Sequence, residues 1–393
     1  MKAREIRPGV SWVGAIDWDR RLFDELIPLP NGTSYNSYLV RGSEKTALID
    51  TADPAKSETL LAQLEAVETL DYLIIQHVEQ DHSGSAPLVL DKYPDIQIIS
   101  SPKAKTMIAD HLGIPEARIH AVEDRESLSL GDRTFEFIHA PWVHWPETML
   151  TYLKEEKLLF TCDLFGSHLA TDELFSGDGS HVCEAAKRYY AEIMMPFAHL
   201  IKGHLEKLSS FDIEMIAPSH GPVHNNPGWI LDAYSHWVHD APKNLALIPF
   251  TSMHESTALM VDYLIEALND RGVHVHSFHM SKTDLGEYAI HLVDAATVIF
   301  GTPTVLVGPH PSIVLAAYLT AALRPKLQNA AVIGSYGWAG KAAEKTQQLC
   351  EQLKVTWLDP VFAKGAPTQE TYAQLNRLAD EVASRHKGLE SGE

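Results

Sequence analysis

The sequence predicts an α/β protein built from two domains of different architecture, divided near residue 245. Its 393 residues exceed the usual size of one domain. In residues 1–244, short β-rich runs follow one another with few helices between them, which is typical of sheets packed face to face under helices. In residues 245–393, five strands alternate with helices, which is typical of a doubly wound parallel sheet.

The elements of the first domain follow from two periodicities. Short apolar runs bounded by turn residues predict strands at Lys45–Asp50, Asp71–Gln76, Ile96–Ser100, Thr134–His139, Met149–Tyr152, Lys157–Cys162 and Glu214–Ala217. Apolar residues at helical spacing predict helices at Ser57–Val67, Lys103–His111, Glu184–Ile201 and Gly228–His239. The polar segment His239–Asn244, which contains a proline, is expected to link the domains.

The second domain alternates more regularly. Its predicted strands are Leu245–Phe250, Val273–Phe278, Thr297–Phe300, Asn329–Gly334 and Val355–Leu358. Its predicted helices are Ser256–Asn269, Pro311–Ala322, Lys341–Leu353 and Gln369–Arg385. The tail Lys387–Glu393 is expected to be frayed.

The charge of the chain excludes some classes of partner. Lys and Arg number 32 and Asp and Glu 52, for a formal net charge of −20. Residues 1–250 hold 21 basic and 37 acidic side chains, so most of the excess belongs to the first domain. Because such a surface repels nucleic acid and anionic membranes, we expect neither as a partner.

Cysteine content and apolar runs indicate the compartment. Cys162, Cys183 and Cys350 are too far apart to predict a disulfide framework, and no CxxC pair occurs. The first twenty residues hold no continuous apolar run of the kind found in signal peptides. The longest apolar stretch, Ser312–Leu323, is too short and too mixed to cross a membrane. We therefore expect a cytoplasmic protein.

Potential metal ligands follow one predicted strand at close spacing. The chain holds 21 histidines, and two of them lie in the run His77-Val-Glu79-Gln-Asp81-His82. Burying four such groups unpaired is costly, so the run indicates a metal site or a dense hydrogen-bond network. A solvated polar loop is the alternative, which the apolar strand before the run and Gly84 after it disfavour.

Three more candidate ligands follow other predicted strands. They are His144, Asp163 and His220. Each alone would be read as a cap or turn residue, but their shared position after strands makes the set specific. Four imidazoles and three carboxylates without a thiolate suit iron, although ligand type leaves zinc and manganese open.

Three loops of the second domain indicate a flavin site. The hydroxyl-rich loop Thr251–Thr257 precedes a helix, and such a helix start without a Walker lysine suits the monophosphate of FMN. A Ser/Thr N-cap without any ligand is the alternative. Two further loops after strands favour the flavin, because ligands bind beyond the carboxyl ends of such sheets. The candidate contacts are Ser252, Met253, His254, Glu255, Ser256 and Thr257, then Thr302, Pro303, Thr304, Val305 and Leu306, then Ser335, Tyr336, Gly337, Trp338 and Gly340.

These motifs in this order resemble the flavodiiron proteins. The first loop reads HxExDH, and His144-Trp-Pro-Glu147, Cys162-Asp-Leu-Phe-Gly166 and Ser219-His-Gly221 follow it. Val13–Trp18, Gly32–Tyr38, Tyr189–Ile193 and the three loops of the second domain extend the resemblance over essentially the whole chain. The resemblance implies a metallo-β-lactamase-like αββα domain at 1–244 and a flavodoxin-like FMN-binding domain at 245–393.

The resemblance also implies how the ligands divide. His77, Glu79 and His144 would hold the iron that faces the flavin, Asp81, His82 and His220 would hold the other, and Asp163 would bridge them. Family members differ in whether the residue at His82 coordinates. Around the irons, Tyr190 and His168 match segments that line the pocket, and Asp24 stands where many relatives have a histidine.

Two departures lie in the flavin loops. His254 stands where relatives usually have Trp, and Leu306 and Val307 stand where they often have two Asn. The hydroxyls expected at the phosphate are retained at Ser252, Ser256 and Thr257. We therefore expect FMN to bind with altered contacts to its ring.

The resemblance implies an oxidoreductase that reduces O2 to water, NO to N2O, or both. Electrons would come through FMN from an external donor, which could be a rubredoxin, another small redox protein or reduced F420. A head-to-tail homodimer, or a dimer of dimers, is expected. The sequence leaves the choice between O2 and NO open.

Two alternatives come from other classes of protein. One is a zinc-dependent hydrolase of the same fold with a regulatory flavin module. Zinc hydrolases of this superfamily usually read HxHxDH, so Glu79 disfavours it. The other is a non-enzymatic electron carrier with a degenerate metal pocket, which the complete set of seven ligands disfavours.

Overall fold

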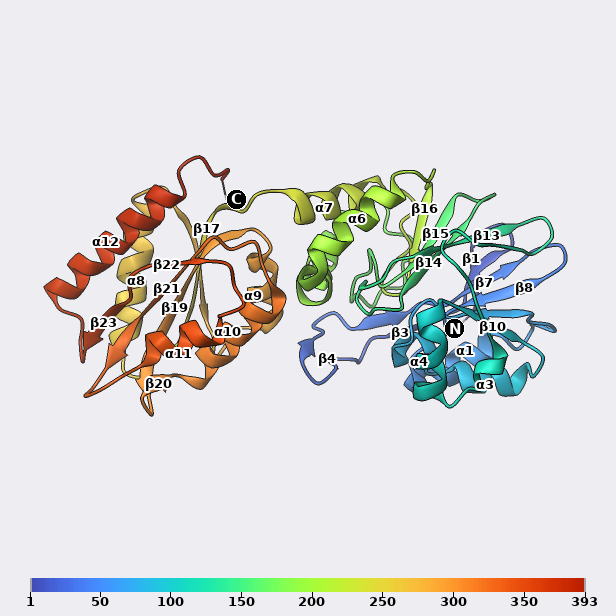
Figure 1. The fold of residues 1–393 in the computed structure, drawn as a ribbon, viewed down its shortest axis with the longest axis horizontal. Helices are drawn as coiled ribbons and strands as arrows, with labels where there is room; N and C mark the ends of the chain where they lie inside the picture. The colour runs from blue at the N-terminus through green and yellow to red at the C-terminus, as the bar shows by residue number, and fades with distance from the viewer. Residues whose placement is uncertain (1, 392–393) are drawn as a thin grey trace. The chain divides into compact units, whose positions relative to one another are not determined.

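The computed structural model describes residues 2–391, which form two compact units (Figure 1). The first unit consists of the chain up to Tyr190 together with Phe197–Val238. The second consists of Ala191–Pro196 and the chain from His239 onward. Among the described residues, every helix is too short or too polar to span a bilayer.

The first unit contains two large sheets. The strands of the first sheet are, in spatial order, β1 (Arg4–Arg7), β2 (Val10–Trp12), β7 (Tyr38–Arg41), β8 (Thr46–Ile49), β9 (Tyr72–Ile74), β10 (Gln97–Ser100) and β11 (Ile119–Ala121). Those of the second are β12 (Ser127–Ser129), β13 (Thr134–His139), β14 (Met149–Leu153), β15 (Leu158–Cys162) and β16 (Met215–Pro218). The strands β8 to β11 run parallel, as do β15 and β16.

Short elements complete this unit. Two small ribbons pair β3 (Ala15–Asp17) with β6 (Thr33–Tyr35), and β4 (Leu22–Phe23) with β5 (Ile27–Pro28). The helices are α1 (Ser57–Gln63), α2 (Gln80–Ser83), α3 (Ala86–Lys92), α4 (Pro102–Leu112), α5 (Cys183–Tyr189), α6 (Ala198–Leu208) and α7 (Gly228–His239).

Alternation along the strands builds the layers of the first unit. In β8, Leu48 packs with α1, α3 and α4, whereas its neighbours Ala47 and Ile49 pack with Phe160 and the rest of the second sheet. Successive side chains of a strand point to opposite faces, so one sheet can serve two cores. The predicted two-sheet sandwich under helices is confirmed.

The second unit is a doubly wound sheet. Its parallel strands lie in the order β18 (His274–His279), β17 (Lys243–Phe250), β19 (Ala295–Val305), β21 (Asn329–Tyr336) and β22 (Thr356–Trp357), with β23 (Val361–Lys364) also beside β21. The antiparallel β20 (Gly308–Pro309) pairs with the end of β19. This order is flavodoxin-like, so the predicted parallel sheet is confirmed.

Helices cover both faces of this sheet. They are α8 (Ser256–Asn269), α9 (Leu285–Leu292), α10 (Pro311–Leu323), α11 (Ala342–Leu349) and α12 (Gln369–Arg385). Figure 1 shows α8 and α12 on one face and the other three on the opposite face. Apolar residues of α8 and α12, among them Leu264 and Leu378, share one buried cluster with Ile299 of β19.

Two sequence expectations for this chain were wrong. The helix expected at Glu184–Ile201 is broken into α5, a π-turn at Tyr190–Met194, a 3₁₀ turn at Met195–Phe197, and α6. Pro196 explains part of the break, since proline lacks an N–H for an uninterrupted helix. The tail is held at Asn244, whose N–H donates to Glu390 O at 2.7 Å; residues 392 and 393 lie outside the described chain.

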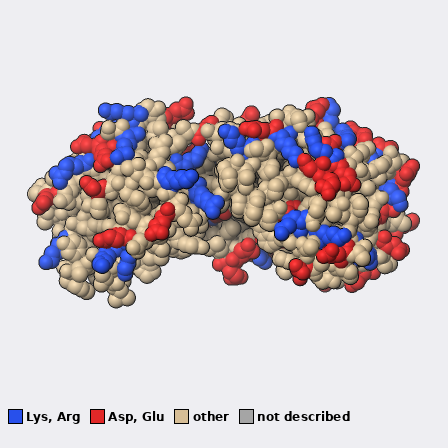
Figure 2. All heavy atoms as spheres, in the orientation of Figure 1, with Lys and Arg blue, Asp and Glu red and all other residues tan. Residues whose placement is uncertain are grey.

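Charged side chains are intermixed on the face of the molecule in Figure 2. Among the exposed ion pairs of the described residues, Lys157 lies 2.6 Å from Asp212 and 2.9 Å from Glu214. Exposed pairs of this kind stabilise a fold by about 1 kcal/mol at most. The mixture of surface charges therefore matters more for which partners can bind than for the stability of the fold.

Candidate metal centre

The loop after β9 is shaped to present several ligands. The N–H groups of His82 and Ser83 donate to Glu79 O, and the Ser83 hydroxyl donates to Val78 O at 2.6 Å. From the segment after β8, Thr51 donates through both its N–H and its hydroxyl to His82 O. These bonds fold the run from His77 to His82 into a fixed turn that includes α2.

The remaining candidate ligands reach the same place from the second sheet. Asp163 follows β15 and His220 follows β16, which run parallel, so their carboxyl ends meet at one edge. His144 comes from the connection between β13 and β14. The structure thus brings all seven predicted ligands together in two groups.

The first group faces one oxygen of Asp163. His77 Nε2 lies 3.1 Å from Glu79 Oε2 and 3.6 Å from Asp163 Oδ2. His144 Nε2 lies 3.1 Å and 3.7 Å from the same two oxygens. Two imidazole nitrogens and two carboxylate oxygens therefore converge on one point.

The second group faces the other oxygen of Asp163. His220 Nε2 lies 3.1 Å from Asp81 Oδ2 and 3.3 Å from Asp163 Oδ1. His82 Nε2 lies 3.3 Å from Asp81 Oδ1 and 3.1 Å from Asp163 Oδ1. Asp163 is thus a carboxylate with one oxygen toward each group, as a bridging ligand requires.

Unsatisfied atoms indicate that these groups fit metal ions. Both carboxylate oxygens of Asp81 and Nε2 of His82 are buried without a hydrogen-bond partner, although they lie close to one another. Buried polar atoms rarely remain without a partner. Short contacts without hydrogen-bond geometry are expected where lone pairs point at a common cation. The all-nitrogen and oxygen donor set suits two iron ions.

Residues outside the two ligand groups fix the orientation of two of the imidazole rings by hydrogen bonds. His77 Nδ1 donates to Glu147 Oε1 at 2.7 Å, and His220 Nδ1 donates to Ser34 O at 2.7 Å. With the proton on Nδ1, the Nε2 lone pair of each ring is free for a metal. Glu147 lies in the HWPE motif, but sequence reasoning gave it no role.

The histidines and carboxylates of the cluster strongly influence one another's pKa. Burial disfavours protonated His220, yet its contacts with Asp163 and Asp81 outweigh burial and raise its pKa to about 10. Burial likewise opposes ionised Asp163, but His82 and His220 hold its pKa well below the ordinary value. Metal binding at such a cluster displaces protons from the histidines and depends on pH accordingly.

The sequence also suggested His168 and Asp24 as residues close to the metal ligands, and the two differ in exposure. His168 is buried, with Nδ1 2.9 Å from Thr33 Oγ1 and its ring against His220. Asp24 is exposed, but desolvation and the nearby Glu79 and Asp81 raise its pKa. His168 therefore borders the cluster, and Asp24 is near enough for the charges of Glu79 and Asp81 to act on it.

Tyr190 is directed away from the cluster. Its hydroxyl donates to Trp237 O at 3.3 Å, and its ring packs on Tyr234. The preceding residue, Tyr189, donates instead to Asp163 Oδ1 at 2.8 Å. The π-turn begins at Tyr190, directly after Tyr189, so helix periodicity alone could not predict which tyrosine faces the ligands. The sequence showed only that two tyrosines are adjacent, and it did not show which of them faces the ligands.

Of the three segments predicted as flavin loops, the first follows β17. Most of the second, residues 302–305, instead belongs to the carboxyl end of β19, and the third begins within the carboxyl end of β21. Ser252 Oγ accepts from Ala258 N at 3.2 Å, and Thr257 Oγ1 lies 3.2 Å from Ser335 Oγ. Met253 is 53% exposed and Trp338 is 90% exposed, which leaves apolar surface at this edge.

The third loop leaves space for a ligand. A side chain at Gly337 would meet no other atom within 4 Å. Nearby, Thr304 Oγ1 is buried without a hydrogen-bond partner. An orphaned hydroxyl, open backbone and exposed aromatic surface together fit a flat, polar-edged cofactor such as FMN.

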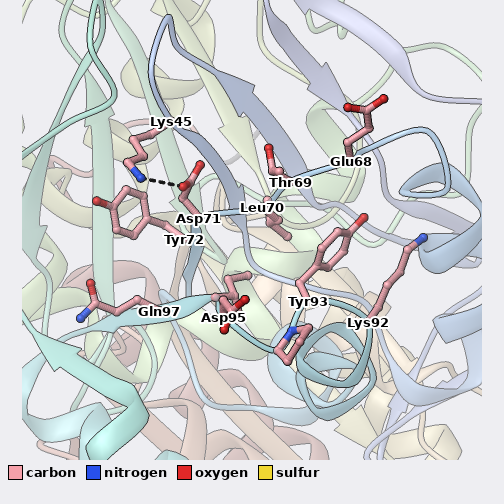
Figure 3. A pocket seen from close by; sticks show the side chains of 12 residues that line it. Lys45, Glu68, Thr69, Leu70, Asp71, Tyr72, Lys92, Tyr93, Asp95 and Gln97 are labelled. Carbon is pink, nitrogen blue, oxygen red and sulfur yellow. Dashed lines mark hydrogen bonds and ion pairs between the residues drawn. The ribbon is translucent and has the colours of Figure 1, made fainter.

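A separate pocket of about 450 Å³ lies at the amino ends of β9 and β10 (Figure 3). Lys45 pairs with Asp71 at 2.9 Å, and the Tyr93 hydroxyl donates to the main-chain oxygens of Leu64 and Val67. These polar groups are already satisfied by the protein. The pocket is at the opposite end of these strands from His77 and forms no part of the cluster.

Comparison with known proteins places these features in context. The family model described as ODP family beta lactamase matches residues 33–221. A nitric oxide reductase of Moorella thermoacetica is 34% identical, over 97% of this chain and 98% of its own. The structure of rubredoxin oxygen:oxidoreductase from Desulfovibrio gigas has a TM-score of 0.94 at 30% identity, covering 98% of both chains. The structure of a flavodiiron protein from Giardia intestinalis has a TM-score of 0.89 at 27% identity, covering 98% and 97%.

Proposed function

This chain belongs to the flavodiiron protein family, and we propose that it reduces O2 to water, NO to N2O, or both, with electrons that enter through FMN. It is an oxidoreductase whose cofactors are two non-haem irons and FMN. One observation carries the proposal for this chain: Asp163 directs one oxygen to each of two groups of His and carboxylate ligands.

We propose that the two groups hold one iron each. His77, Glu79 and His144 would hold the iron that faces the flavin, while a second set, Asp81, His82 and His220, would hold the other. Asp163 would bridge them. When bound, the irons and FMN together supply the four electrons that O2 needs, or the two that a pair of NO molecules needs. The Lewis acidity of two adjacent cations stabilises a reduced diatomic substrate.

The chain's own residues would prepare the pocket for that chemistry. Tyr189 donates a hydrogen bond to the carboxylate of Asp163, and the ring of the buried His168 packs against His220. Asp24, an exposed carboxyl group on which the charges of Glu79 and Asp81 act, would carry protons from solvent to the reduced substrate.

The flavin would occupy the loops of the second unit. Ser252, Ser256 and Thr257 would hold its phosphate at the start of α8, where N–H groups and the helix dipole favour an anion. The second and third loops would line its ring. We propose residues 1–244 as the diiron domain and 245–393 as the FMN domain.

Partners and location are also part of the proposal. An external donor, a rubredoxin or another small redox protein, would reduce the flavin, and reduced F420 is the alternative donor. A head-to-tail homodimer would bring the flavin of one protomer to the irons of its partner. A cytoplasmic location is supported by three free cysteines.

Stopped-flow mixing tests the proposed function. Protein loaded with iron and FMN is reduced anaerobically and mixed with O2 or with NO at equal concentration. Rapid flavin reoxidation by at least one gas is expected, and the faster gas identifies the preferred substrate. Failure of both gases to reoxidise the flavin, or two zinc ions with hydrolase turnover, would contradict the proposal.

A further inference from the structure

Glu147 is a buried carboxylate directly behind a proposed iron ligand. It is 1% exposed. Its Oε1 accepts from His77 Nδ1 at 2.7 Å and from Val78 N at 3.0 Å. Two donors on one oxygen fix this carboxylate, and the carboxylate in turn fixes the plane and tautomer of the imidazole.

The other oxygen of Glu147 has no partner. Its Oε2 is buried without a hydrogen bond. Among the described residues, no Lys or Arg forms an ion pair with Glu147. The negative charge is therefore neither screened by water nor cancelled by a basic side chain, and it acts chiefly on His77. Coulomb interactions at such a short distance are strong away from solvent.

Among the described residues, no carboxylate from outside the second ligand group is hydrogen-bonded to one of its imidazoles. Asp50 lies within 4.8 Å of His82, but its oxygens accept from the main-chain and side-chain N–H groups of Gln76. His220 Nδ1 donates to a main-chain carbonyl, Ser34 O, at 2.7 Å. A carbonyl orients the ring but brings no net charge. An imidazole hydrogen-bonded to a carboxylate is a stronger electron donor than one bonded to a neutral carbonyl. The two metal positions are therefore unequal in this chain, although their ligands look alike.

We propose that Glu147 is a positioning residue that makes the His77 position the more electron-rich of the two. This inference rests on the proposed diiron function. The Glu147–His77 pair would stabilise the ferric state at that position more than the ferrous state. The iron beside His77 would then have the lower reduction potential and would be the first of the two to be oxidised.

The decisive variant is Glu147→Gln, which keeps an acceptor oxygen and removes the charge. Loss of such an outer carboxylate usually weakens metal binding by about 10–100-fold. We expect the loss for ferric iron to exceed that for ferrous iron. Each tenfold excess corresponds to a rise of about 59 mV in the reduction potential of one iron.

Two further variants separate charge from structure. Glu147→Asp keeps the carboxylate and should restore part of the effect. Ser101→Ala removes the hydroxyl that donates to Glu147 O at 2.6 Å and to which Ala104 N donates at the start of α4. It perturbs the same segment without touching the carboxylate. We expect it to lower stability while leaving both potentials unchanged.

Redox titration followed by Mössbauer spectroscopy of protein reconstituted with ⁵⁷Fe gives the readout. In Glu147→Gln, the signals of one iron should shift and those of the other should stay. Unchanged potentials in a fully loaded Glu147→Gln protein, or equal shifts in the Ser101→Ala control, would overturn the inference. If wild-type protein takes up no iron pair at all, the proposed function fails instead, so the two failures are distinct.

Discussion

Asp163 is the residue on which the two ligand groups converge, and its surroundings explain why it stays ionised. Burial alone would raise its pKa, but His82 and His220 hold that pKa well below the ordinary value. Tyr189 adds a hydrogen bond to Oδ1. A buried charge is stable only when it is paired and hydrogen-bonded, and Asp163 meets both conditions before any metal is counted.

The adjacent tyrosines give a test at the scale of single residues. Tyr189→Phe removes the hydrogen bond to Asp163, and we expect turnover to fall by about tenfold, since hydrogen bonds to charged groups contribute about 1.5–3 kcal/mol. Tyr190→Phe is the matched control. It removes a bond to Trp237 O and leaves the bond between Tyr189 and Asp163 in place, so stability should fall by about 1 kcal/mol while turnover stays. Stopped-flow rates and urea unfolding measure both; the reverse pattern would contradict the assignment.

Single residues also show what the sequence could and could not predict. The convergence of the seven candidate ligands was predictable because HxExDH spacing, together with His and Asp after strands, is a local pattern. Glu147 and Tyr189 were not, because their roles depend on the orientation of the His77 ring and on the π-turn that begins at Tyr190. Neither feature leaves a periodic signal in the chain.

At the scale of elements, the hairpin between β19 and β20 is strained. Its two-residue tip, Leu306-Val307, has φ values of 47° and 64°. Such a turn favours Asn-Gly, and a β-branched residue in this region is costly. Relatives were expected to carry Asn at both positions, so the departure seen in the sequence has a physical consequence here. Strain beside a predicted cofactor loop is consistent with a functional constraint.

Replacing Leu306-Val307 with Asn-Gly tests that strain. We expect the free energy of unfolding of the second unit to rise by about 1 kcal/mol, because the left-handed conformation becomes acceptable. Val305→Gly, one residue earlier and still in β19, should lower it by about 0.5–1 kcal/mol. Urea unfolding of both variants without FMN provides the comparison. Destabilisation by Asn-Gly would show that the tip is not strained.

A second element-scale test concerns pH and α12. At the end of this helix, His386 is buried, with Nε2 2.7 Å from Thr297 Oγ1 and Nδ1 2.9 Å from Asn244 Oδ1. Burial lowers its pKa to about 4. Its ordinary value is about 6.5, so the unfolded chain takes up a proton first as the pH falls. Stability should be complete above pH 6.5 and fall by about 3 kcal/mol as the pH approaches 4.

Urea unfolding between pH 4 and pH 7 measures this loss. Replacing His386 with Gln keeps a polar group but removes the titration. The variant should therefore lose less stability than the wild-type protein over the same pH range. An equal loss in both proteins would assign the pH dependence to other groups.

Secondary structure was predicted correctly from the sequence where a single pattern dominated. The predicted helices at Ser256–Asn269 and Gln369–Arg385 match α8 and α12, since both have a clear apolar stripe and defined starts. The tail was expected to fray from its composition. Instead Asn244 N donates to Glu390 O, a pairing between distant segments that local sequence cannot indicate.

At the scale of the whole molecule, the two proposed cofactor sites belong to different compact units. Their stabilities should therefore respond to different cofactors. A ligand that binds only the folded state stabilises the unit that holds it, by about 2.7 kcal/mol at a hundred times its Kd. The net charge of −20, in contrast, bears on partners and solubility rather than on this division.

Cofactor removal tests that division. Chelating iron should lower the unfolding temperature of the first unit and leave that of the second unchanged. Removing FMN should lower the unfolding temperature of the second unit and leave that of the first unchanged. Differential scanning calorimetry resolves the two transitions if they are separate. A shift of both transitions on iron removal alone would show that the units do not respond independently.

The central claim is that the site bridged by Asp163 is where O2 or NO is reduced. The most direct measurement is gas consumption by Asp163→Asn, reconstituted with iron and FMN and reduced by the same donor as wild-type protein. The variant keeps the shape of the side chain and removes the charge that both ligand groups share. We expect FMN content and flavin reduction to be unchanged, and O2 and NO consumption to fall by at least tenfold. Consumption equal to that of the wild type, in a variant shown to contain iron, would contradict the account.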